Sequence, residues 1–163
     1  MIRTMITFER TLRVLPVVYL LHIVEEYGAG FPAWMSLHMQ ADMGDAGFLR
    51  NNALFMVILV TLCLWAARST TRLSAFLLLA WTSGQLFWNF VFHLATTVIA
   101  DSYSPGLVTA ALLYQPVSLA MAALAVRDRH LSLSDTLFAF TIGAGLMLFV
   151  IWAGLWHFSL PVV

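Results

Sequence analysis

The sequence has 163 residues, of which 61% are hydrophobic and only 10% are charged; its mean hydropathy is +0.89 and its formal net charge is zero. Soluble domains average about 45–50% apolar and about 25% charged residues. These values therefore exclude a water-soluble globular domain, and the zero net charge gives no indication of a nucleic-acid partner. The composition predicts an all-α, polytopic transmembrane helical bundle that forms a single transmembrane domain over residues 1–163.

The first apolar segment, residues 10–27, is short for a membrane span. Its apolar run extends from Val14 to Val24 and is interrupted by His22, which gives about half of the ~20 residues that a free span needs. Such a segment either crosses the membrane or enters it and turns back. Two glutamates follow the apolar run before any cleavage site for a signal peptide, so we interpret the segment as an uncleaved helix.

Four further segments are long and apolar enough to cross a bilayer. Short clusters of Ser, Thr, Arg, Gly and Pro separate them, which predicts short loops and antiparallel neighbouring helices. A short interfacial segment is expected after the first helix, within residues 31–47. The sequence thus predicts about five transmembrane helices, at roughly residues 10–27, 49–67, 73–100, 106–126 and 134–158.

The arginines indicate whether the first segment crosses. If all five segments cross, seven of the eight arginines lie on one side of the membrane and only Arg50 lies on the other; a re-entrant first segment would give four against four. The positive-inside rule favours five crossings, with the N-terminus in the cytoplasm and the C-terminus outside. We therefore expect a multi-pass protein of the bacterial cytoplasmic membrane.

In this topology the polar side chains of the spans gather in the outer half of the bilayer. Gln85, Asn89 and His93 are spaced by four residues and form one stripe on their helix. The other polar residues expected in the outer half are His22, Glu25, Glu26, Asn51, Asn52, Tyr114, Gln115, Trp156 and His157. The inner halves are apolar, which favours a one-sided pocket over a permeation path, because a path needs polar groups through the full thickness.

Glu25 and Glu26 are expected to face the bundle, because an ionised carboxylate facing lipid near the bilayer centre costs about 2.5–3.5 kcal/mol. His22 and Glu26 are four residues apart and share a helix face, and Glu25 lies close beside His22. His93 is the obvious complement from another helix. Imidazole and carboxylate groups suit zinc or non-haem iron, and three protein ligands leave one position open for water or substrate.

We predict that His22, Glu26 and His93 bind a divalent metal, zinc or iron, and that Glu25 and Asn89 join them in the catalytic set, Glu25 as general base. The sequence does not distinguish which glutamate is the ligand and which the base. Without a metal, the same groups would form a proton relay. The residues predicted to line the substrate pocket are Gln85, Trp88, Asn52, Tyr114 and Gln115.

The chain resembles the family of small integral membrane proteins named for its HXXEE motif. The matching residues are His22, Glu25 and Glu26, the turn with Gly28, Phe31 and Pro32, Asn89 with His93, and the run Tyr103-Ser104-Pro105-Gly106. The similarity extends from the first to the fourth helix. The family is defined by its motif, without an established activity, so the resemblance supports His22, Glu25 and Glu26 as the defining cluster and implies no substrate or reaction.

Three classes of function remain open. The favoured one is a membrane-embedded enzyme that acts on a small lipophilic molecule by metal-assisted hydrolysis or oxidation, or by acid/base isomerisation or cyclisation. The alternatives are a small proton- or cation-coupled transporter, which the apolar inner half disfavours, and a structural subunit whose polar cluster bonds helix to helix. The lipid bilayer is the expected partner, nucleic acid is not, and self-association into a homo-oligomer stays open.

Overall fold

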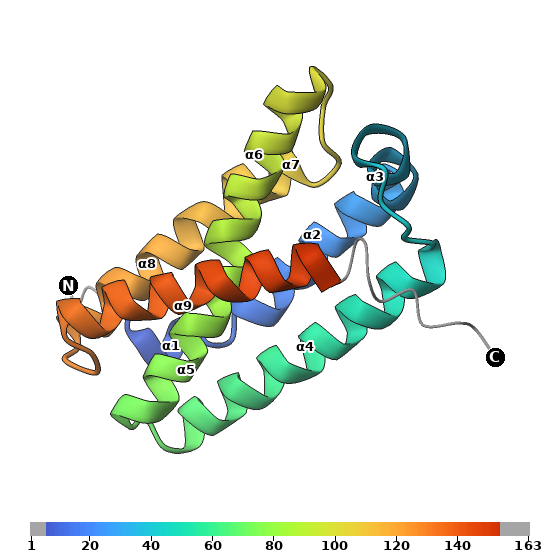
Figure 1. Cartoon of the computed structure of the whole chain (residues 1–163). Coiled ribbons are helices and arrows are strands. Elements are labelled where there is room, and N and C mark those ends of the chain that lie inside the picture. The colour runs from blue at the N-terminus through green and yellow to red at the C-terminus, as the bar shows by residue number, and fades with distance from the viewer. Residues whose placement is uncertain (1–5, 154–163) are drawn as a thin grey trace, which may run out of the picture.

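The computed structural model describes residues 6–153, and this part of the chain forms a helical bundle without strands (Figure 1). The all-α prediction is therefore confirmed. Most elements are α-helices, and two short segments, η1 and η2, are π-helical. In chain order the elements are α1 (Phe8–Thr11), α2 (Leu15–Gly28), α3 (Phe31–Met39), α4 (Asp45–Arg68), α5 (Arg72–Thr82), η1 (Ser83–Trp88), α6 (Asn89–Ala100), α7 (Leu107–Thr109), η2 (Ala110–Tyr114), α8 (Gln115–Arg127) and α9 (Leu133–Trp152).

Within residues 6–153, four helices are long and apolar enough to cross a membrane: α4, the continuous helix from Arg72 to Ala100, the helix from Leu107 to Arg127, and α9. The segments Phe8–Gly28 and Phe31–Met39 meet at a bend of 64°. If this bent pair is counted as a single span, the number of spans rises to five. The chain is thus a multi-pass integral membrane protein. The last predicted helix, residues 134–158, extends past α9, and its residues 154–158 lie outside the described part of the chain.

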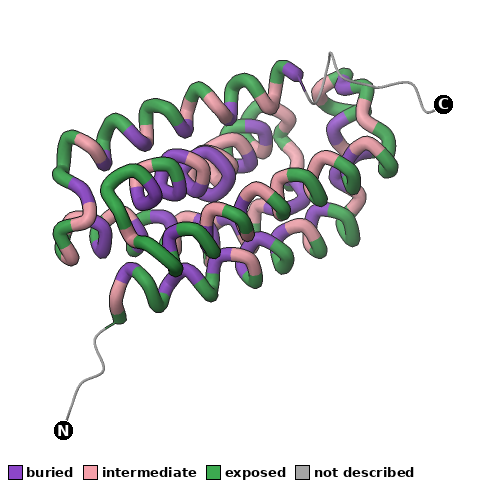
Figure 2. The backbone as a smooth tube through the Cα atoms, turned by 90° about the horizontal axis from the view of Figure 1, so that it is seen from below, coloured by how far each residue is buried: buried purple, intermediate pink, exposed green. Residues whose placement is uncertain are grey.

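The helix from Arg72 to Ala100 forms the centre of the bundle. Half of its most apolar stretch is buried, against 17–28% for the other three spans. The remaining helices pack around it, with buried positions turned inwards and exposed ones outwards (Figure 2). A side chain on this helix therefore faces several neighbours at once, which makes it the natural place for a site built from several helices.

The central helix crosses α9 at very short range. A Cβ atom added to Gly143 would lie 2.0 Å from Ser83 Oγ and 2.7 Å from the backbone nitrogen of Gly84. The Ser83 hydroxyl is also 3.2 Å from the carbonyl oxygen of Ala139, to which it donates a hydrogen bond. Small residues allow the backbones of membrane helices to approach closely, so this crossing fixes the position of η1 in the bundle.

The two π-helical segments contact each other and lie next to the polar residues predicted as a pocket. A π turn inserts one residue into a helix and changes which side chains face inwards, and such turns are frequent at functional sites. Gln85 of η1 and Tyr114 of η2 are 4% and 0% exposed, respectively. The π segments thus direct one polar side chain from each of two helices into the bundle.

Candidate metal centre and adjoining cavity

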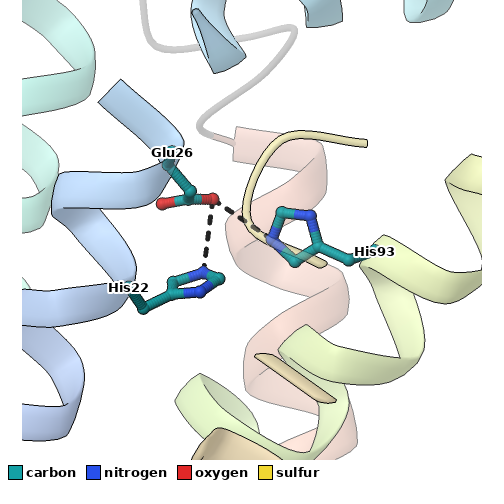
Figure 3. Close-up of side chains that lie close together, drawn as sticks. All are labelled: His22, Glu26 and His93. Atoms are coloured by element: carbon teal, nitrogen blue, oxygen red, sulfur yellow. Dashed lines mark ion pairs between the residues drawn. The ribbon is translucent and has the colours of Figure 1, made fainter. Parts of the chain in front are cut away.

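Three buried side chains from two helices meet at one point: His22 and Glu26 of α2, one turn apart, and His93 of α6 (Figure 3). Glu26 Oε1 lies 3.5 Å from His22 Nε2 and 3.2 Å from His93 Nε2. The exposed fractions of His22, Glu26 and His93 are 0%, 4% and 0%. The structure therefore brings together the three residues that the sequence predicts as metal ligands, with one ligand atom from each within 4.8 Å of the others.

Hydroxyl groups hold the far side of both imidazole rings. His22 Nδ1 lies 2.9 Å from Thr109 Oγ1, and His93 Nδ1 lies 2.9 Å from Ser104 Oγ. The Thr109 hydroxyl donates to the carbonyl oxygen of Gly106 at 3.3 Å, so its oxygen is free to accept from the Nδ1–H of His22. The same tautomer of His93 places its Nδ1–H on Ser104 Oγ, which also accepts from the Thr96 hydroxyl at 3.3 Å.

With these tautomers, the Nε2 atoms of His22 and His93 turn their lone pairs towards Glu26. Both atoms are buried and have no hydrogen-bond partner among the described residues. Two imidazole lone pairs and a carboxylate oxygen facing one another repel unless a cation lies between them. Metal-binding histidines show this arrangement, with the second ring nitrogen donating to a fixed acceptor.

The two distances from Glu26 to the imidazole nitrogens fit a small divalent ion. Zinc is bound at about 2.0–2.2 Å by nitrogen and oxygen in tetrahedral sites, which places two ligand atoms roughly 3.3–3.5 Å apart. Glu26 Oε1 is separated from the two imidazole nitrogens by 3.5 and 3.2 Å. Two histidines and one carboxylate would leave a position of the ion free for water or substrate.

The loop that follows α6 covers this cluster, and Gly106 makes the closest approach. Its φ angle is +103°, and an added Cβ atom would lie 2.8 Å from Glu26 Cγ, 2.8 Å from His93 Cε1 and 2.9 Å from His22 Cε1. Glycine is required here both for the left-handed backbone and for the space. The loop therefore supplies a lid without a side chain, together with the two hydroxyls that hold the imidazoles.

Glu25 lies beside the three ligands but points to this loop. Its carboxylate accepts hydrogen bonds from the backbone nitrogens of Val108 (3.2 Å) and Thr109 (2.7 Å) and from the Tyr103 hydroxyl. Partial burial and the hydrogen bond to Glu25 raise the pKa of Tyr103 above its usual value, so the phenol stays a donor. Of the two glutamates, Glu26 is the one placed with the imidazoles, and Glu25 ties the loop to α2.

A cavity of about 80 Å³ adjoins the cluster. Four of the residues predicted for the substrate pocket or catalytic set, Asn52, Gln85, Asn89 and Tyr114, line it together with His22 and Glu26. Its remaining wall is largely apolar and comes from several helices and the segment after α3. The apolar lining residues are Ile23, Phe31, Met43, Phe48, Phe55, Phe92, Met147, Val150 and Ile151.

Trp88 and Gln115 do not line the cavity, contrary to the sequence-based prediction. Trp88 ends the π-helical segment η1, and its indole Nε1 donates to the carbonyl oxygen of Phe140 on α9 at 2.9 Å. Gln115 follows Tyr114 directly, and successive residues of an α-helix point about 100° apart. Tyr114 lines the cavity, whereas Gln115 is half-buried and is not among the lining residues.

Residues that sequence reasoning did not select complete the site. Tyr19 lines the cavity and donates its hydroxyl to Asn52 Oδ1 at 2.7 Å; its position three residues before His22, on the same helix face, was a usable signal. Ser104 and Gly106 were identified only as part of the family resemblance. Thr109, at the end of the short helix α7, had no recognisable signal, because its role depends on how the loop folds back.

The fold and the site define a class of protein: an all-α integral membrane protein with a buried cluster of two histidines and one carboxylate beside a small cavity. The chain matches, over residues 13–121, the family model described as "Protein of unknown function with HXXEE motif". It therefore belongs to the HXXEE family. The matched range contains all three cluster residues and the covering loop. Comparisons with curated proteins and with solved structures found no match.

Proposed function

We propose that this protein is a membrane-embedded, metal-dependent hydrolase whose single divalent ion, zinc by preference, is held by His22, Glu26 and His93. The observation that supports it is the convergence of two buried Nε2 atoms and one carboxylate oxygen at 3.2–3.5 Å, with no hydrogen-bond partner for either Nε2 atom within the described range. A buried acceptor without a partner costs about 1–3 kcal/mol, and a shared cation removes that cost at both nitrogens.

Bound zinc would polarise a substrate carbonyl and lower the pKa of water to about 7. The chain's own residues do the rest of the work. Ser104 and Thr109 orient the imidazoles, Gly106 closes the cluster from the loop side, and Glu25 holds that loop in place. The cavity of about 80 Å³ has room for several water molecules, since one needs about 10–15 Å³.

The apolar wall of the cavity favours a lipophilic substrate. Phe48, Phe55 and Ile151 line it from α4 and α9, both of which expose large hydrophobic side chains on their outer faces. With the N-terminus in the cytoplasm, as the arginines indicate, the cluster lies in the outer half of the membrane. We infer that the substrate is a small lipophilic molecule that reaches the site from the outer half of a bacterial cytoplasmic membrane.

Elemental analysis of the detergent-purified full chain, prepared without chelator, tests this proposal. We expect close to one zinc per chain, lost in the His22→Ala/Glu26→Ala double variant and retained in His38→Ala, which removes an exposed histidine. Size-exclusion chromatography and thermal melting show whether the double variant is still folded. Wild-type protein without metal, or with iron in place of zinc, would overturn the zinc hydrolase.

A further inference from the structure

Two amide side chains in the cavity have polar atoms that the described protein leaves without partners. Gln85 is 4% exposed, and its Nε2 atom is buried without a hydrogen-bond partner among residues 6–153. Asn89 lies four residues later on the same continuous helix, and its Oδ1 atom is also buried without a hydrogen-bond partner among these residues. Both residues line the cavity that also contains His22 and Glu26.

A third amide in the same cavity shows the usual arrangement. Asn52 Oδ1 accepts from the Tyr19 hydroxyl at 2.7 Å, and its Nδ2 atom donates to the carbonyl oxygen of Phe48 at 3.0 Å. Buried polar groups in folded proteins almost always have such partners. Gln85 and Asn89 thus differ from a neighbour of the same chemistry, which leaves their polar atoms available to a molecule bound in the cavity.

The chemistry of that ligand follows from the pair. Gln85 offers a donor and Asn89 an acceptor, and residues four apart on a helix are neighbours with Cβ atoms about 5–6 Å apart. A carboxamide presents the complementary groups side by side, because its carbonyl oxygen accepts and its N–H donates. An ester lacks the N–H and would leave Asn89 Oδ1 without a partner.

We propose that the cavity binds the carboxamide group of a lipophilic amide, with Gln85 Nε2 donating to the carbonyl oxygen and Asn89 Oδ1 accepting from the amide N–H. This inference names the substrate class of the same site, and only its reaction rests on the proposed hydrolase. In that reaction, the oxygen of water bonds to the carbonyl carbon and the C–N bond breaks. The nitrogen leaves as an amine with one proton of the water, and the other proton goes to the carboxylic acid.

The size of the cavity supports a small polar group as its occupant. Sites for whole drug-sized molecules measure about 300–1,000 Å³, whereas this cavity measures about 80 Å³. It accommodates the few atoms of an amide group, and the apolar substituents then lie against Phe48, Phe55 and Ile151. The π-helical segment η1, which contains Gln85, is the local distortion that turns this side chain towards the cavity.

Binding of octanamide to the full chain in detergent, measured by titration calorimetry, tests the inference. We expect Gln85→Met and Asn89→Leu, which keep side-chain size, each to weaken binding at least tenfold. Gln115→Met, on a helix of the same bundle but outside the cavity, should bind as the wild type does. On the wild type alone, N,N-dimethyloctanamide, which has no N–H, should bind at least tenfold more weakly than octanamide.

The carboxamide site would be overturned if Gln85→Met bound octanamide as tightly as the wild type does. It would also be overturned if the wild type bound octanamide and N,N-dimethyloctanamide equally well. The comparison of the two amides uses only the wild type, so it tests the proposal even if a substitution prevents folding. Zinc in a wild type that does not bind octanamide would overturn the carboxamide site alone. Octanamide binding by a wild type without metal would instead overturn the hydrolase and support the binding site.

Discussion

In the described part of the chain, two groups of histidine and carboxylate residues bring three ligand atoms within 4.8 Å of one another: His22, Glu26 and His93, and a second group of Glu9, Asp128 and His130. The second group lies where α1 packs against α8, and its side chains are 45%, 19% and 18% exposed. The first group is buried. The two groups have similar spacing between their ligand atoms, but the first group is buried and the second is partly exposed.

The second group is already neutralised by the protein. Glu9 Oε1 pairs with His130 Nε2 at 2.8 Å, and Asp128 accepts from Arg127 Nε at 2.7 Å and from the backbone nitrogen of Phe8 at 2.9 Å. Asp128 therefore has donors of its own, one of them a charged arginine, and the group ties the N-terminal helix to the loop after α8. Closely spaced ligand atoms indicate a metal only where the protein supplies no donor or cation for them.

The largest effect that separates the two groups is metal binding itself. We expect His93→Ala to lose all of the bound metal, because two ligands from one helix turn do not hold a divalent ion in place of three. His130→Ala should keep the wild-type content. Elemental analysis of both variants beside the wild type measures the difference, and equal loss from both would remove the distinction between a metal site and a salt bridge.

The hydroxyls behind the imidazoles should have the next largest effect. Loss of a group that orients a metal-binding histidine costs about 10–100-fold in metal affinity, so we expect Ser104→Ala and Thr109→Val each to weaken zinc binding by that factor. Ser36→Ala is the matched control, because the Ser36 hydroxyl donates only to the backbone carbonyl oxygens of Pro32 and Ala41. Competition with a zinc-binding dye measures the affinity; unchanged values in both variants would show that the hydroxyls do not orient the rings.

Two glycines of the described residues have positive φ angles, and comparing them separates the cost of backbone strain from the cost of crowding at the site. Gly30 (φ +76°) has no atom within 4 Å of an added Cβ, whereas Gly106 (φ +103°) meets all three ligand residues. Gly30→Ala should cost about 1–2 kcal/mol for the left-handed backbone, and Gly106→Ala about 1–3 kcal/mol more for overpacking. Thermal melting and metal content check this: only Gly106→Ala should lose metal, and equal behaviour would show that the loop does not close on the cluster.

Sequence reasoning predicted the long helices and two of the three clustered residues, His22 and Glu26, from local patterns, and added His93 as a complement from another helix. Apolar length predicts spans, and the spacing of His22 and Glu26 places them on one helix face. Trp88 and Gln115, which were predicted as pocket residues, are not among the residues that line the cavity; Trp88 ends the π-helical segment η1 and Gln115 directly follows η2. Thr109 was missed because its contact with His22 joins residues 87 positions apart and depends on a loop conformation that only the folded structure shows.

The smallest expected effect is on the stability of the fold, from the group of Glu9, Asp128 and His130. The hydrogen bond from Arg127, followed by that from the Phe8 nitrogen, lowers the pKa of Asp128. A lowered carboxyl pKa stabilises the fold above the usual value of about 3.9 and loses this contribution as the pH falls through the folded-state value. Because the pair is partly exposed, Asp128→Asn should cost less than about 1 kcal/mol at pH 7, with metal content unchanged. Thermal melting between pH 7 and pH 3 should show the wild type and the variant converging at the acid end. Parallel curves would mean that the ionised carboxylate does not hold α1 in place.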